Sequence, residues 1–232
     1  MISIQRTAAD LAHLLFPVVC SACGLTLHQG EKAICTHCLN DLPYTDFHLN
    51  SANQVAKQFW GRIPCDAAMA MLYFKRGSKT QHLIHHLKYE GKTELGEILG
   101  GLLGERLKLS NQYKAIDTII PVPLHAKKER SRGYNQCQHI ANGLANSLRL
   151  SVSNDILLRK KQTSSQTSKS RYTRYENIQS VFQVNSTESI QNKHILLVDD
   201  VITTGATLEA CGNSLFNSGI RKLSIVALAF TK

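Results

Sequence analysis

The stretch that decides the fold spans residues 195–207 and reads Ile195-Leu196-Leu197-Val198-Asp199-Asp200-Val201-Ile202-Thr203-Thr204-Gly205-Ala206-Thr207. Its apolar start is typical of a strand buried on both faces of a parallel sheet. Two adjacent carboxylates follow, then a small turn rich in hydroxyl groups, and then the start of a helical pattern. Because ligands bind at the carboxyl ends of strands in open α/β sheets, the stretch predicts a ligand site at its centre.

The chemistry of this stretch suits a sugar phosphate. Asp199 and Asp200 can accept hydrogen bonds from sugar hydroxyl groups. The backbone N–H groups and hydroxyl groups of the turn can hold a phosphate at a helix N-terminus. A ribose 5-phosphate is therefore expected, with its phosphate on Thr203, Thr204, Gly205, Ala206 and Thr207. The simpler alternative is a capped helix after a strand, with both acids solvated. A Walker A loop is excluded, because its Gly-Lys-Ser/Thr ending is absent.

The rest of the chain alternates between strand-like and helix-like segments, which predicts an open, mostly parallel α/β sheet. The expected strands are 67–74, 116–122, 156–159, 180–184, 194–199 and 223–230, and the expected helices are 50–58, 81–88, 95–107, 135–148 and 207–216. The helix at 95–107 contains Gly96, Gly100, Gly101 and Gly104. Glycine weakens a helix, so we expect these residues to permit close packing on the sheet.

Composition sets the broad class. The 232 residues are 43% hydrophobic and 19% charged, which is typical of a globular protein. Length predicts one sizeable domain with a small appendage, which we divide into residues 1–60 and 61–232. No stretch approaches the roughly 20 apolar residues that a membrane-spanning helix needs.

Four of the seven cysteines form two CxxC pairs, Cys20 with Cys23 and Cys35 with Cys38. Four thiolates at this spacing predict a tetrahedral Zn²⁺ site in the N-terminal domain, and because the four sulfur ligands complete the shell, the site is expected to be structural. The alternatives are redox-active dithiols or two unrelated reduced pairs. An odd number of cysteines and the lack of a clear secretion signal favour a reducing, cytoplasmic location. Residues 5–16 are expected to form an amphipathic helix that leads into this cluster.

The positive charge is concentrated in one segment. The net charge is +10, and residues 125–175 carry eleven Lys and Arg residues against two acidic ones. Such a concentration predicts a polyanionic partner, which could be a nucleic acid, an acidic membrane surface or a phosphorylated small molecule.

Residues 195–207 resemble the phosphoribosyl diphosphate (PRPP) binding motif of type I phosphoribosyltransferases. Other segments resemble the competence protein F-like (ComF/GntX) branch of that family, which carries an N-terminal four-cysteine zinc finger. These segments are 86–91, 121–125, 130–136 and 174–177 with Phe182, so the resemblance covers nearly the whole chain. One departure lies near Gln166, where Ser168, Lys169 and Ser170 stand in place of the usual Leu.

The resemblance implies that a nitrogen nucleophile displaces pyrophosphate from PRPP, with Mg²⁺ bound to the diphosphate. It assigns catalytic roles to Asp199, Asp200 and Arg174, with Arg174 on a loop at 160–177 that closes over the site. It also places Lys127, Lys128, Arg130 and Arg132 at the pyrophosphate. The acceptor stays unknown, because a variable hood selects it; the finger or residues 45–65 are candidates for that hood.

Two other classes of function stay open. One is a single-stranded nucleic-acid-binding protein that uses the basic segment and Tyr134, Tyr172 and Tyr175. Asp199 and Asp200 weigh against it, since they would repel a phosphate backbone, and we expect any binding to single-stranded DNA to be weak. The other is a regulator that binds PRPP without turnover. His82 and His86 lie four residues apart and could chelate a metal, although a polar helix face is the simpler interpretation. The oligomeric state is open, a homodimer included.

Overall fold

The computed structural model describes residues 17–160 and 181–231. The expected helix at 5–16 lies outside the described residues, as do Arg174, Tyr172, Tyr175 and the loop departure near Gln166. Within the described residues, no helix is both long and apolar enough to cross a membrane.

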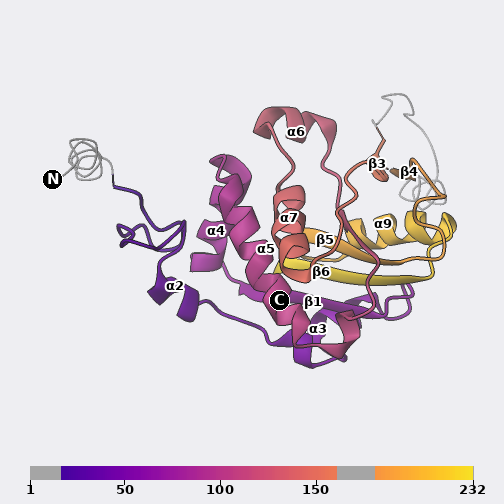
Figure 1. Cartoon of the computed structure of the whole chain (residues 1–232), viewed down its shortest axis with the longest axis horizontal. Helices are drawn as coiled ribbons and strands as arrows, with labels where there is room; N and C mark the ends of the chain where they lie inside the picture. The colour runs from indigo at the N-terminus through magenta and orange to yellow at the C-terminus, as the bar shows by residue number, and fades with distance from the viewer. Residues whose placement is uncertain (1–16, 161–180, 232) are drawn as a thin grey trace.

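The centre of the molecule is a sheet of four parallel strands in the order β1-β6-β5-β2, which confirms the α/β class (Figure 1). The strands are β1 (Ala67–Phe74), β2 (Thr118–Pro121), β5 (His194–Ile202) and β6 (Lys222–Thr231). β5 lies between β2 and β6, and Val198 pairs with Pro121 on one side and with Val226 on the other. Residues 195–198 of this central strand are buried and apolar, because helices such as α7 (Gln136–Leu148) and α9 (Ala206–Asn217) pack on the sheet there.

Strand β5 is longer than the sequence predicts. Its ladder with β6 continues past the two acids, through the pairs Val201–Ala229 and Ile202–Phe230. Asp199 and Asp200 therefore lie inside the last part of the strand, where the sheet fixes their backbone.

Helices surround the sheet. They are α4 (Lys79–Tyr89), α5 (Thr93–Lys108), α6 (Ala126–Arg132), α7 (Gln136–Leu148) and α9 (Ala206–Asn217), with a 3-10 turn at Asn111–Tyr113. A small antiparallel pair is formed by β3 (Leu157–Arg159) and β4 (Phe182–Val184). Helix α6 was not expected, because it buries none of its residues and so has no apolar stripe.

The glycines of α5 pack against another helix, so the expectation that they face the sheet is wrong. A side chain added at Gly96, Gly100 or Gly104 would meet atoms of α7. On the opposite helix, one added at Gly143 would meet the backbone of Glu97. The missing side chains thus let α5 and α7 approach closely, and α7 in turn packs on β2 and β5.

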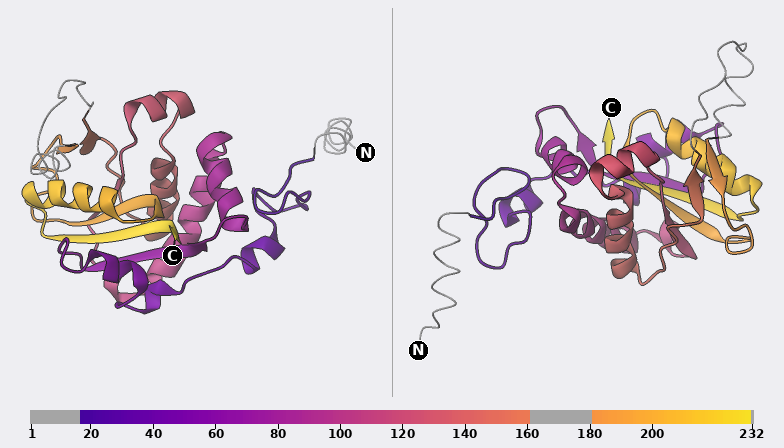
Figure 2. Two further views of the ribbon diagram at one scale, coloured as in Figure 1. Left: turned by 180° about the vertical axis from the view of Figure 1, so that it is seen from behind. Right: turned by 90° about the horizontal axis from the view of Figure 1, so that it is seen from above.

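The segment before β1 covers the free edge of the sheet. The N–H of Thr45 donates to the carbonyl of Met71 at 3.0 Å, and the N–H of Tyr73 donates to Pro43 at 2.8 Å. A 3-10 turn (Phe47–Leu49) and α3 (Gln54–Phe59) follow, and α3 packs on β1. The cysteine-rich segment with α2 (Thr36–Asn40) lies at one end of the molecule, and α9 lies towards the other (Figure 2).

We predict that Gly143→Ala destabilises the protein, because the added methyl group would meet backbone that cannot move without separating α5 from α7. Overpacking of this kind costs about 1–3 kcal/mol. Gly101→Ala is the matched control, since its added carbon has only the carbonyl of Gly143 within 4 Å, at 3.9 Å. This variant should be stabilised by up to about 1 kcal/mol through helix propensity. Urea denaturation measures both, and equal effects in the two variants would contradict the packing argument.

Candidate functional site

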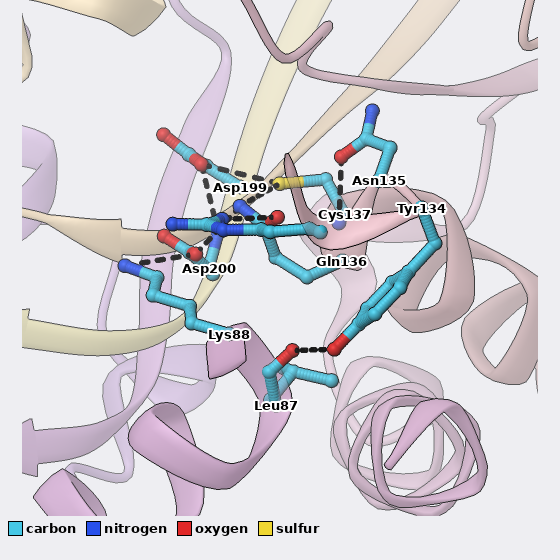
Figure 3. Close-up of polar contacts among 9 residues, drawn as sticks. Leu87, Lys88, Tyr134, Asn135, Gln136, Cys137, Asp199 and Asp200 are labelled. Atoms are coloured by element: carbon cyan, nitrogen blue, oxygen red, sulfur yellow. Dashed lines mark hydrogen bonds and ion pairs between the residues drawn. The ribbon is translucent and has the colours of Figure 1, made fainter. Parts of the chain in front are cut away.

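The candidate site is built around Asp199 and Asp200 on β5 (Figure 3). The Asp200 side chain is buried, and its Oδ2 accepts a hydrogen bond from Nε2 of Gln136 at 2.9 Å. The same oxygen lies 3.0 Å from Nζ of Lys88, at the end of α4. Elements that are distant in sequence thus converge on one carboxylate.

Asp199 is held by the residue next to Gln136. Its Oδ1 accepts from the backbone N–H of Asp200 at 2.8 Å and from the thiol of Cys137 at 3.4 Å. Two consecutive residues of α7 therefore hold two consecutive residues of β5.

Asn135 places the start of α7 beside the acids. Its side chain caps the helix by accepting from the N–H of Cys137 at 3.0 Å, and it donates to the carbonyl of Val122 at 3.1 Å. Val122 directly follows β2, the strand beside β5. A polar side chain after a strand and before an apolar helix thus orients the first turn of α7 towards the sheet.

Burial, followed by the nearby charge of Asp200, raises the pKa of Asp199 to about 7. Like charges at adjacent carboxyl groups disfavour double ionisation. A cation or a hydrogen-bond donor entering the site would relieve this cost, so the pair is suited to binding hydroxyl groups.

The turn after β5 is exposed and ends in a helix N-terminus. Thr203, Thr204, Ala206 and Thr207 are exposed. Gly205 is buried, adopts a φ of +73° and caps α9. The N–H of Ala206 donates to Oγ1 of Thr204 at 3.4 Å. The residues that the sequence predicted for the phosphate therefore lie together on the same strand end as the two acids, in a geometry that suits an anion.

The four predicted pyrophosphate residues separate into two groups. Lys127, Lys128 and Arg130 are exposed on α6, and none of them pairs with an acid among the described residues. Arg132 reaches the acidic pair indirectly: its guanidinium donates to Oε1 of Gln136 at 2.7 Å and lies 5.2 Å from the Tyr89 ring centre. Only Arg132 joins the network around Asp200.

The sequence reasoning missed three residues of this network, Lys88, Gln136 and Cys137. Lys88 and Gln136 stood in the stretches quoted for the resemblance, but no residue pattern linked either of them to Asp200. Tyr134 was named as a stacking residue. Its hydroxyl group donates to the carbonyl of Leu87 at 2.6 Å, and the side chain is only half-exposed.

The four cysteines predicted to bind metal do come together. The Sγ atoms of Cys20, Cys23, Cys35 and Cys38 all lie within 4.8 Å of one another. The sulfur of Cys20 accepts N–H bonds from Cys35 at 3.3 Å and from Ala22 at 3.4 Å. Four converging sulfur ligands fit Zn²⁺.

The pKa values of these thiols indicate how a bound cation would affect the cluster. Burial raises the pKa of Cys20, but backbone N–H donors outweigh it and lower the pKa to about 7. Burial, followed by the neighbouring thiols, raises the pKa of Cys38. Without a metal only part of the set would ionise, so a divalent cation would stabilise the remaining thiolates.

His82 and His86, the alternative metal ligands, each have a polar partner of their own. Nδ1 of His82 lies 3.1 Å from the carbonyl of Ala22, and Nδ1 of His86 lies 2.6 Å from Oε2 of Glu90. Among residues 17–160 and 181–231, one group of three or more His, Cys, Asp or Glu side chains lies close enough together to share a metal ion, and it is the four-cysteine cluster.

Comparison with known proteins finds one matching domain family and several relatives. Residues 135–232 match the phosphoribosyl transferase domain family. Competence protein F of Haemophilus influenzae is 29% identical over 223 residues, which cover 90% of this chain and 96% of that protein. The DNA utilization protein YhgH of Escherichia coli K12 is 26% identical over 217 residues, covering 92% and 90%. Among solved structures, the glutamine PRPP amidotransferase of B. subtilis aligns at 14% identity and a TM-score of 0.45, covering 62% of this chain and 30% of that one.

The C-terminal part of the chain, residues 135–232, is therefore similar to the phosphoribosyl transferase domain. Over about nine-tenths of its length the chain is similar to competence protein F and to the DNA utilization protein YhgH, and this similarity includes the segments 86–91 and 121–136 that carried the resemblance.

We predict that the purified protein carries about one Zn²⁺ per chain. Cys35→Ser should lose the metal and loosen residues 17–42 while the sheet stays folded, because metal binding there supplies local folding energy. Metal analysis and hydrogen exchange measure the two effects. Cys65→Ser, which changes a half-buried cysteine outside the cluster, should keep its zinc. A well-folded, zinc-free preparation would contradict the prediction.

We also predict that Asp199→Asn stabilises the free protein above pH 7. Folding raises the pKa of Asp199 from about 4 in the unfolded chain to about 7. The free energy of unfolding of the wild-type protein therefore falls as the pH rises from about 4 to about 7. The asparagine of the variant does not ionise, so the free energy of unfolding of Asp199→Asn relative to the wild-type protein should increase across this pH range and become constant above it. Urea titrations of both proteins at several pH values provide the measurement. A gain that does not change with pH would show that ionisation of Asp199 is not its cause.

Proposed function

We propose that the protein binds PRPP at the end of β5 and transfers its phosphoribosyl group to a nitrogen nucleophile, with release of pyrophosphate. The observation that carries the proposal is the adjacency of Asp199 and Asp200 to the exposed turn at the start of α9. Paired carboxylates suit two ribose hydroxyl groups, and the turn suits the 5-phosphate. The match of residues 135–232 to the phosphoribosyl transferase family adds independent support.

In the proposed reaction, a bond forms between the nucleophile and C1 of the ribose while the bond from C1 to the diphosphate oxygen breaks. Pyrophosphate leaves with the electron pair, and the nucleophile loses its proton to solvent or to the pyrophosphate. Asp199 and Asp200 would hold the ribose and stabilise positive charge on its ring. Arg132 would face the diphosphate, where Mg²⁺ supplies further charge neutralisation when bound. Arg174 lies outside the described residues and stays a candidate for the same role.

The basic helix α6 favours nucleic acid as a second candidate ligand. Lys127, Lys128 and Arg130 are exposed there, and two relatives are named for competence and for DNA utilization. Single-stranded DNA would then bind at α6, weakly and with a strong dependence on salt. Tight DNA binding that PRPP does not compete for would favour this function over phosphoribosyl transfer.

A reducing compartment fits the free thiols. All seven cysteines lie in the described residues, and none forms a disulfide. We therefore also propose a cytoplasmic location, where thiols stay reduced.

The proposal predicts that Asp200→Asn lowers PRPP affinity by about tenfold to a hundredfold, because a hydrogen bond to a charged group is worth about 1.5–3 kcal/mol. Binding of inorganic phosphate should hold or improve, since a nearby negative charge is removed. Calorimetry with and without Mg²⁺ measures both ligands.

Asp117→Asn is the matched control, because Asp117 binds the N–H of His194 at the other end of the sheet. Its PRPP affinity should match that of the unchanged protein. Wild-type protein without PRPP affinity would refute the proposal. Binding without pyrophosphate release across a panel of bases would indicate a non-catalytic PRPP-binding regulator.

A further inference from the structure

The turn after β5 is tied to the segment that precedes β1. Nε2 of Gln58 donates to the carbonyl of Thr203 at 3.2 Å. Nη1 of Arg62 donates to the carbonyl of Thr204 at 2.8 Å and to the carbonyl of Gln58 at 3.1 Å. Two consecutive carbonyl groups of the turn therefore point towards this segment.

These two bonds also decide where the backbone N–H groups of the turn point. In a planar trans peptide the N–H lies opposite the carbonyl. The N–H groups of Thr204 and Gly205 must therefore point away from Gln58 and Arg62. Successive N–H groups on one side of a turn form an anion-binding concavity. Phe59 supports the same turn, since a side-chain carbon added at Gly205 would lie 2.9 Å from Cε1 of its ring.

Arg62 also neutralises an acid that would oppose a phosphate. Glu209 lies in the first turn of α9, where its charge would repel an anion at the helix N-terminus. Oε2 of Glu209 accepts from Nε of Arg62 at 3.0 Å and also contacts Nη2. The two side chains are 33% and 26% exposed, so water screens this pair only partly. One guanidinium thus pairs with Glu209 and orients the Thr204 peptide.

We propose that Arg62 is a positioning residue for the 5-phosphate of the ligand, acting through the Thr204 peptide and through Glu209. The inference rests on the proposed function and adds to it a dependence of phosphate binding on the segment that precedes the sheet. Arg62 need not touch the ligand. The two effects of Arg62 can be separated. Orienting the Thr204 peptide requires a hydrogen-bond donor to its carbonyl group, whereas the second effect requires only that the charge of Glu209 is neutralised.

Four variants separate the two effects: Arg62→Gln, Arg62→Lys, Glu209→Gln, and the double variant Arg62→Gln with Glu209→Gln. Calorimetry measures affinity for ribose 5-phosphate, and for inorganic pyrophosphate as a ligand without the ribose. Arg62→Gln should weaken ribose 5-phosphate binding by about tenfold or more. Glu209→Gln alone should strengthen it by about two- to fivefold. The double variant should recover part of the loss, and Arg62→Lys should also be intermediate. Pyrophosphate affinity should change less than twofold.

Lys222→Gln is the control, since it removes another surface ion pair, with Asp66 at 2.9 Å, before the start of β1. Its ribose 5-phosphate affinity should not change. If the wild-type protein binds ribose 5-phosphate and Arg62→Gln binds it equally well, the role of Arg62 is refuted and the proposed function stands. If Arg62→Gln weakens binding and Glu209→Gln restores none of it in the double variant, the charge-balancing part is refuted. If the wild-type protein binds neither ribose 5-phosphate nor PRPP, both proposals fail together.

Discussion

The placement of two adjacent carboxylates inside a buried parallel strand is the constraint on which the rest of the site depends. Asp199 and Asp200 interrupt the apolar run of β5, and burying an acid is costly unless it is paired or hydrogen-bonded. The fold meets that cost with donors from three directions: Lys88 from α4, Gln136 and Cys137 from α7, and the backbone of Asp200 itself. Burial, followed by the charge of Asp200, still raises the pKa of Asp199, so these donors offset the cost of burying the two acids only in part.

The hydrogen bonds around Gln136 connect this acidic pair to the basic helix α6. Arg132 can only donate, so Oε1 of Gln136 accepts from it and Nε2 is left to donate to Asp200. The orientation of the amide is therefore set by its two partners. A ligand that drew Arg132 away would also change the hydrogen bonding of Asp200, which gives the proposed diphosphate and ribose positions a direct physical link.

The segment before β1 has a structural task in addition to linking the cysteine cluster to the sheet. Its residues 43–45 cover the edge of β1, and its later part supports the turn at 203–205. An uncovered edge strand would invite pairing with other chains. Through Arg62, the same segment reaches the position where we expect the phosphate. Residues 45–65 are also a candidate for a hood that selects the acceptor, and two of them, Gln58 and Arg62, contact the turn at 203–205.

The sequence by itself determined the sheet, the acidic pair, the turn and the four-cysteine cluster. Each of these features depends on residues that are close together in the sequence: an apolar run, a pair of acids or a CxxC spacing. Backbone geometry places such residues near one another whatever the rest of the fold is. Tertiary structure alone decided that Lys88 and Gln136 contact Asp200 and that Arg62 contacts the turn after β5. Each lies on an element far from β5 in sequence, and its partner is set by how helices pack. The glycines of α5 show the same limit: a stripe of small residues predicts close packing, but only the fold shows that the partner is α7 and not the sheet.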